Sequence, residues 1–108
     1  MSAKTVRYVK VGRAEDVPDG RPELFDVEDR QIAVYRLSDG YYAIEDICTH
    51  DGGPLAEGEI DGDEVVCPRH GARFDIKTGA ARCMPAVTPV ESYPVKVEGG
   101  DLYLGLPD

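Results

Sequence analysis

Both histidines of the chain lie beside a cysteine, and the four residues together could bind a metal. Cys48 and His50 are separated by one residue, Cys67 and His70 by two, and residues 51–66 lie between the two pairs. Thiolate ligands suit iron, zinc and copper(I), whereas imidazole suits zinc, iron and copper. Pairs of this mixed type, which use every histidine of the chain, predict one centre bound by two sulfur and two nitrogen atoms.

The residues around the two pairs favour a shared site. Residues i and i+2 of an extended segment point to the same side, so Cys48 and His50 can face one centre together. Pro68 fixes its own φ and biases Cys67 towards an extended conformation. Between the pairs, an Asp-Gly turn signal predicts a hairpin over 59–66. Such a hairpin would bring the two loops together.

The elements that must hold these loops are predicted to be β-strands. Apolar residues alternate with other residues over 93–97 and 102–106, and less cleanly patterned β-rich runs cover 5–11, 31–37 and 41–47. Turn signals separate the runs: Ser38-Asp39-Gly40, Asp61-Gly62, Lys77-Thr78-Gly79 and Gly99-Gly100. No window shows convincing helical spacing of apolar residues. The pattern predicts an all-β antiparallel sandwich or open barrel, and segment 48–85, rich in Gly, Pro, Cys and His, departs from it.

Length and composition indicate one folded domain and exclude some partners. The chain has 108 residues, of which 42% are hydrophobic and 31% charged. Twenty-one acidic and 12 basic side chains give a net charge of −9, which disfavours nucleic acid and anionic membranes because both attract basic surfaces. No apolar run approaches the ~20 residues needed to cross a bilayer. Three cysteines do not suit a secreted disulfide framework, so we expect a cytoplasmic protein with a metal or redox role.

The spacing of the two Cys-His pairs resembles the Rieske [2Fe–2S] motif, in which two histidines replace two cysteines on one iron. The resemblance covers about residues 46–86, and it is greatest to the small Rieske-type ferredoxins that serve multicomponent oxygenases. It implies one [2Fe–2S] cluster, with Cys48 and Cys67 on the inner iron and His50 and His70 on the outer iron. It also implies a Rieske-like fold.

The resemblance further implies how the chain is organised. We expect a single Rieske domain over residues 1–108. A small cluster-binding subdomain, formed by two loops over about 46–86, would be inserted in the β base.

Several positions separate this chain from other branches of the family. Respiratory Rieske proteins link their cluster loops by a disulfide, whose positions here are Gly53 and Arg69. That class also places hydroxyl residues where this chain has Ala72 and Phe74. Hydrogen bonds to sulfur stabilise the reduced cluster and raise its potential. We therefore expect a centre of low potential.

The resemblance implies an electron carrier, not an enzyme. An oxygenase catalytic subunit needs a second iron held by two further histidines and a carboxylate, but both histidines of this chain belong to the predicted cluster. No G-x-G-x-x-G segment is present for binding NAD or flavin. The expected donor is an NAD(P)H-dependent flavoprotein reductase, and the expected acceptor is a terminal non-haem iron oxygenase of a ring-hydroxylating dioxygenase system. Two alternatives remain at this point. They are the Rieske-like small subunit of an assimilatory nitrite reductase and a structural Cys2His2 zinc module.

Three further residues receive expectations. Docking to both redox partners is expected to be transient, at the face carrying the two histidines, with Arg69 and Arg73 as candidates for meeting an acidic partner. Ordinary solvated surface charge is an equal alternative for them. Cys83 is expected to be a small buried residue and not a ligand.

Overall fold

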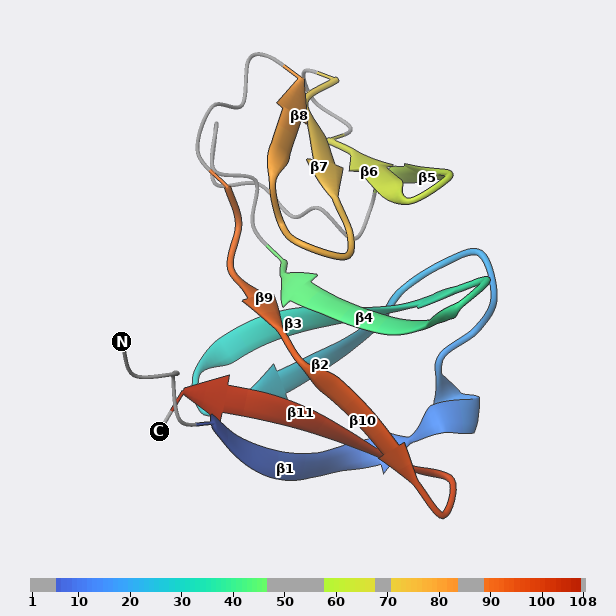
Figure 1. The fold of residues 1–108 in the computed structure, drawn as a ribbon, viewed down its shortest axis with the longest axis vertical. Helices are drawn as coiled ribbons and strands as arrows, with labels where there is room; N and C mark the ends of the chain where they lie inside the picture. Colours follow the sequence, from blue (N-terminus) through green and yellow to red (C-terminus); the bar gives the residue numbers. More distant parts are fainter. Residues whose placement is uncertain (1–5, 47–57, 68–70, 84–88, 108) are drawn as a thin grey trace.

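The structure, a computed structural model, describes residues 6–46, 58–67, 71–83 and 89–107. In these ranges it consists of three antiparallel β-sheets (Figure 1). The first sheet has the order β1 (Val6–Arg13), β11 (Asp101–Pro107), β10 (Val95–Glu98); the second β2 (Glu23–Val27), β3 (Arg30–Leu37), β4 (Gly40–Glu45), β9 (Ser92–Tyr93); the third β5 (Glu59–Asp61), β6 (Glu64–Val66), β7 (Arg73–Asp75), β8 (Ala81–Cys83). The one helix in the described ranges is a 3-10 turn, Ala14–Asp16, and no described helix is long and apolar enough to cross a membrane. The predicted all-β antiparallel fold is confirmed.

The second sheet is the middle layer of the molecule, with the third sheet on one side and the first on the other (Figure 1). Four successive residues of β3, Ile32–Tyr35, are fully buried. Because successive side chains of a strand point to opposite faces, Ala33 and Tyr35 enter the core shared with the third sheet. Ile32 and Val34 enter the core shared with the first sheet. Both faces of β3 are therefore covered.

The core between the first and second sheets follows the predicted alternation closely. Leu102, Leu104 and Leu106 of β11 are each 0% exposed and pack with side chains of the second sheet. Burying a leucine side chain stabilises a fold by about 1.5–3 kcal/mol. This core forms the rigid base on which the third sheet sits.

The predicted single run over 93–97 is wrong, because the structure divides it at Pro94. Residues 92–93 form β9, which pairs with β4, whereas residues 95–98 form β10, which pairs with β11. Proline has no N–H to donate to a ladder, and here its carbonyl accepts a hydrogen bond from the N–H of Gly105 at 2.9 Å. The chain thus crosses from the second sheet to the first at this residue.

The described residues of segment 48–85, whose pattern departs from that of the other strands, form the third sheet. Its first hairpin, over 59–66, is confirmed, with Gly62 at φ 62° in the turn. Strands β7 and β8 were not predicted, because strands of three residues are too short to show a period of two. Strand β2, the edge strand of the middle sheet, was also missed; it alternates between half-buried and exposed residues.

Candidate metal centre

Cys67 is the one predicted ligand that the described residues contain; Cys48, His50 and His70 lie outside them. It directly follows β6, its side chain is 1% exposed, and its thiol forms no disulfide. The N–H of Cys67 donates to the carbonyl of Ala72 at 2.6 Å, and its own carbonyl accepts from the N–H of Gly71 at 3.0 Å. These bonds fix the backbone on both sides of positions 68–70, which include the predicted ligand His70.

The third sheet holds Cys67 in a dry environment. Strand β6 pairs with β7, with Val65 opposite Phe74, and both of these side chains are fully buried. Ala72 is also 0% exposed and belongs to the same core as Cys67. Neither Ala72 nor Phe74 carries a hydroxyl, so neither side chain can donate a hydrogen bond to a sulfur atom there.

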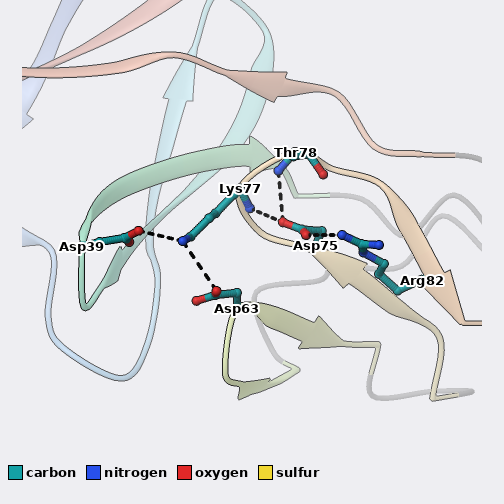
Figure 2. A network of polar contacts seen from close by, with 6 residues as sticks. All are labelled: Asp39, Asp63, Asp75, Lys77, Thr78 and Arg82. Carbon is teal, nitrogen blue, oxygen red and sulfur yellow. Dashed lines mark hydrogen bonds and ion pairs between the residues drawn. The ribbon is translucent and has the colours of Figure 1, made fainter.

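A carboxylate organises the turn that joins β7 to β8. The Oδ1 atom of Asp75 accepts hydrogen bonds from the N–H groups of Lys77 at 2.8 Å and Thr78 at 3.2 Å, and its Oδ2 accepts from Arg82 at 2.8 Å (Figure 2). Partial burial works to raise the pKa of Asp75, but the bonds from Arg82 and the two backbone groups outweigh it and lower that pKa. The turn is therefore held by an ionised side chain.

Lys77 ties this turn to two others. Its ammonium lies 2.7 Å from Asp39, in the turn between β3 and β4, and 3.5 Å from Asp63, in the turn between β5 and β6 (Figure 2). It also lies 5.3 Å from the centre of the Tyr42 ring. The hydrogen bond to Asp39 is the main cause that raises the pKa of Lys77. One side chain thus links the third sheet to the middle sheet.

Arg73, a candidate docking cation, forms ion pairs within its own sheet. Its guanidinium lies 2.8 Å from Asp61 and 3.4 Å from Glu64, and the hydrogen bond to Asp61 raises the pKa of Arg73. Arg73 therefore neutralises carboxylates of its own sheet and is not a free cation. Arg69 lies outside the described residues.

The polar contacts of these turns and one buried hydroxyl were not predicted from the sequence. An Asp two or three residues before a glycine-containing turn is a general signal for the Asp75 arrangement. No local signal links Lys77 to residues as distant as Asp39. Tyr35 is fully buried, and its hydroxyl has no hydrogen-bond partner among the described residues. Burial is the main cause that raises the pKa of Tyr35, and the charge of Asp46 is the second.

The described part of the site fits an iron–sulfur centre. A free buried thiol is a soft donor that suits iron, and a dry core around it excludes water from the metal. The described residues by themselves contain no group of three or more side chains that could hold a metal. The other three predicted ligands, Cys48, His50 and His70, lie outside the described ranges.

Known proteins match the chain along most of its length. Residues 7–94 match the Rieske [2Fe-2S] domain. The 3-phenylpropionate/cinnamic acid dioxygenase ferredoxin subunit of Escherichia coli K12 is 43% identical over 86% of this chain and 88% of its own. The structure of a Sphingomonas yanoikuyae B1 ferredoxin superposes with a TM-score of 0.86 at 33% identity, covering 94% of this chain and 100% of that one.

Two further likenesses differ in what they show. A ferredoxin solved in a complex of reduced oxygenase and oxidised ferredoxin in carbazole 1,9a-dioxygenase has a TM-score of 0.82 at 37% identity, covering 91% of this chain and 92% of that one. Solved small subunits of nitrite reductases are 19% identical. At that level they show the fold alone.

The chain belongs to the Rieske [2Fe-2S] domain family. It is a ferredoxin of the type found in dioxygenase systems, with a Rieske [2Fe–2S] cluster as its cofactor, and it carries electrons without catalysing a reaction of its own.

Proposed function

We propose that this ferredoxin carries single electrons from an NAD(P)H-dependent flavoprotein reductase to the terminal oxygenase of a ring-hydroxylating dioxygenase system. The single observation that carries the proposal is the 43% identity to a dioxygenase ferredoxin subunit over nearly the whole of both chains. The acceptor is supported by a relative, 37% identical, that was solved in complex with an oxygenase. A flavoprotein donor is supported by chemistry, because a flavin accepts a hydride from a nicotinamide and passes on single electrons.

The proposed ligands are Cys48, His50, Cys67 and His70, the first and third on one iron and the two histidines on the other. When bound, the [2Fe–2S] cluster supplies a couple that takes up and releases one electron. Cys67 is supported by its buried, free thiol. The other three are supported by their spacing and by the family match over 7–94.

The chain's own residues hold the centre and keep it dry. The hydrogen bonds of Cys67 to Gly71 and Ala72 orient the second loop from both sides. Val65, Phe74 and Ile76 are fully buried and exclude water behind it. The ion pair between Lys77 and Asp39, at 2.7 Å, joins this sheet to the base.

We propose that residues 1–108 form a single Rieske domain, with a cluster-binding subdomain over about 46–86 inserted in the base. The third sheet, over residues 59–83, supports this division because it has a core face of its own against the middle sheet. We also propose the cytoplasm as the compartment, where a reductase would draw on NAD(P)H. The charge of −9 supports protein partners over nucleic acid or anionic membranes.

A reconstituted chain of three proteins tests the function. The ferredoxin is mixed with the flavoprotein reductase and the oxygenase encoded in the same organism, and reduction of each is followed by stopped-flow absorbance after addition of NADH or NADPH. We expect reduction of the oxygenase only when the ferredoxin is present. A His70→Ala variant serves as the control without a complete ligand set. Electron delivery to a nitrite-reducing subunit and none to the oxygenase would overturn the proposal.

A further inference from the structure

The hydroxyl of Tyr35 is a polar group in an otherwise apolar core. Tyr35 lies on β3, its side chain is 0% exposed, and its hydroxyl has no hydrogen-bond partner among the described residues. A buried hydroxyl without a partner destabilises a fold. Phenylalanine would fill the same space without that loss. The hydroxyl therefore needs an acceptor other than the described protein atoms.

The side chain of Tyr35 lies in the core that also contains Cys67, a proposed ligand of the cluster. The neighbours of Tyr35, Val34 on one side and Ile32 further along, face the core between the first and second sheets. Tyr35 faces the opposite core, together with Cys67 and Phe74. Cys67, which follows a strand of the third sheet, and Tyr35, on a strand of the second sheet, thus contribute a predicted ligand and an unpaired hydroxyl to one buried core.

Two side chains of the described residues that could accept a hydrogen bond are linked to Tyr35 by the structure. Cys67 is the sulfur of the same core, and Asp46 is the anionic group whose charge acts on Tyr35. The hydroxyl bonds to neither of them, and Asp46 has an interaction of its own. The [2Fe–2S] cofactor that the family match assigns to the chain would bring further sulfur acceptors to this core.

We propose that the Tyr35 hydroxyl donates a hydrogen bond to a sulfur atom of the bound [2Fe–2S] cluster and thereby raises its reduction potential. The proposal rests on the cluster assigned above, and it does not depend on the identity of either redox partner. A hydrogen bond to sulfur stabilises the reduced, more negative state more than the oxidised state. It would partly replace the donors that Ala72 and Phe74 cannot provide.

The test compares two tyrosine-to-phenylalanine variants that each remove one buried hydroxyl. Tyr35→Phe removes the proposed donor. Tyr93→Phe is the matched control: Tyr93 is 5% exposed, belongs to the other core, and its hydroxyl already accepts a hydrogen bond from Arg30 at 3.1 Å. Iron and acid-labile sulfide are measured first in the parent protein. A parent without them would show that the cluster assignment had failed, separately from the role of Tyr35.

Protein-film voltammetry and pulsed EPR of the reduced holoprotein give the two readouts. We expect Tyr35→Phe to shift the reduction equilibrium three- to tenfold towards the oxidised state, which is about 28–59 mV at 59 mV per tenfold. We also expect it to lose one exchangeable deuteron coupled to the cluster in D2O. Tyr93→Phe should change neither. If Tyr35→Phe does not take up a cluster, 3-fluorotyrosine at position 35 keeps the shape and strengthens the donor, and the potential should then rise.

Three results would overturn the proposal. The first is a Tyr35→Phe potential equal to that of the parent with the deuteron coupling retained, which would leave the hydroxyl bonded to a buried water. The second is an equal shift in both phenylalanine variants. The third is a lowered potential with the full deuteron coupling retained, which would reduce Tyr35 to a distant dipole.

Discussion

Adding hydroxyls at Ala72 and Phe74 should raise the reduction potential of the cluster. Both side chains are 0% exposed and lie in the core that holds Cys67. Ala72→Ser and Phe74→Tyr each add a single donor with little added volume. The variants are made separately and together.

The size of the effect follows from the energy of a hydrogen bond to a charged group, which is roughly 1.5–3 kcal/mol. Only the difference between the reduced and oxidised states moves the potential, and we take it as about half of that energy. Since about 1.4 kcal/mol corresponds to 59 mV for one electron, each donor should raise the potential by about 30–65 mV. The parent should lie towards the low end of the Rieske range of about −150 to +300 mV.

Voltammetry of the parent and the three variants measures the potentials, and denaturant unfolding serves as an internal check. Because both positions are fully buried, a hydroxyl that reaches no sulfur should instead destabilise the protein by about 1–3 kcal/mol. A raised potential with unchanged stability supports the reasoning. A parent potential near +300 mV, or a double variant whose potential falls with the cluster intact, would refute it.

Three further predictions concern the frame around the centre. Gly79 and Gly62 both have positive φ, but of the two only Gly79 would bring a Cβ into collision with the carbonyl of Val90. Gly62→Ala should lower the free energy of unfolding by about 1–2 kcal/mol, and Gly79→Ala should lower it clearly more. Equal losses in urea unfolding would contradict this. Lys77→Met should lower the urea midpoint at neutral pH. The pKa of Lys77 in the folded protein is raised above its ordinary value of 10.5. The difference in urea midpoint between parent and variant should therefore be largest below pH 10.5 and vanish as the pH rises through the folded pKa. A difference that persists at higher pH would be evidence against the ion pair with Asp39. Arg73→Gln should leave the salt dependence of electron transfer to the oxygenase unchanged, because Asp61 and Glu64 already neutralise Arg73. A flattened salt slope in stopped-flow measurements would instead show that Arg73 takes part in docking.

The base of the molecule could be predicted from the sequence because its strands are long enough to show their pattern. The alternation of Leu102, Leu104 and Leu106 predicts a buried strand face, and all three side chains are buried. The turn signal at Asp61-Gly62 likewise predicts the hairpin that the structure contains. In both places local sequence and tertiary structure agree.

Other parts depend on contacts that no local pattern reveals. The three-residue strands β7 and β8 are held by their neighbours in the third sheet, not by their own alternation. Lys77 meets Asp39 and Asp63 only because the third sheet lies on the middle one. Tyr35 has the pattern of an ordinary core aromatic, and only its buried, unpaired hydroxyl distinguishes it.

The candidate site was accessible from the sequence because its signal is chemical. Two Cys-His pairs with this spacing indicate a mixed-ligand centre whatever holds them. The structure places the free thiol of Cys67 in a buried core, and the assignment of Cys48, His50, Cys67 and His70 as ligands stays a prediction. The ion pair of Arg73 with Asp61 could not be predicted, because charge along the sequence does not reveal which carboxylates a folded sheet brings beside an arginine.

The most direct test of the central claim is EPR of the reduced protein, combined with iron and acid-labile sulfide analysis, on the parent and on His50→Ala and His70→Ala. A [2Fe–2S] cluster predicts two iron and two sulfide per chain. Because a neutral histidine carries less negative charge to iron than a thiolate does, we also expect an average g value below that of an all-cysteine ferredoxin. Both alanine variants should lose the cluster or hold it poorly. Zinc in place of iron, an all-cysteine spectrum, or an unchanged spectrum and full iron content in both variants would contradict a Rieske centre at these residues.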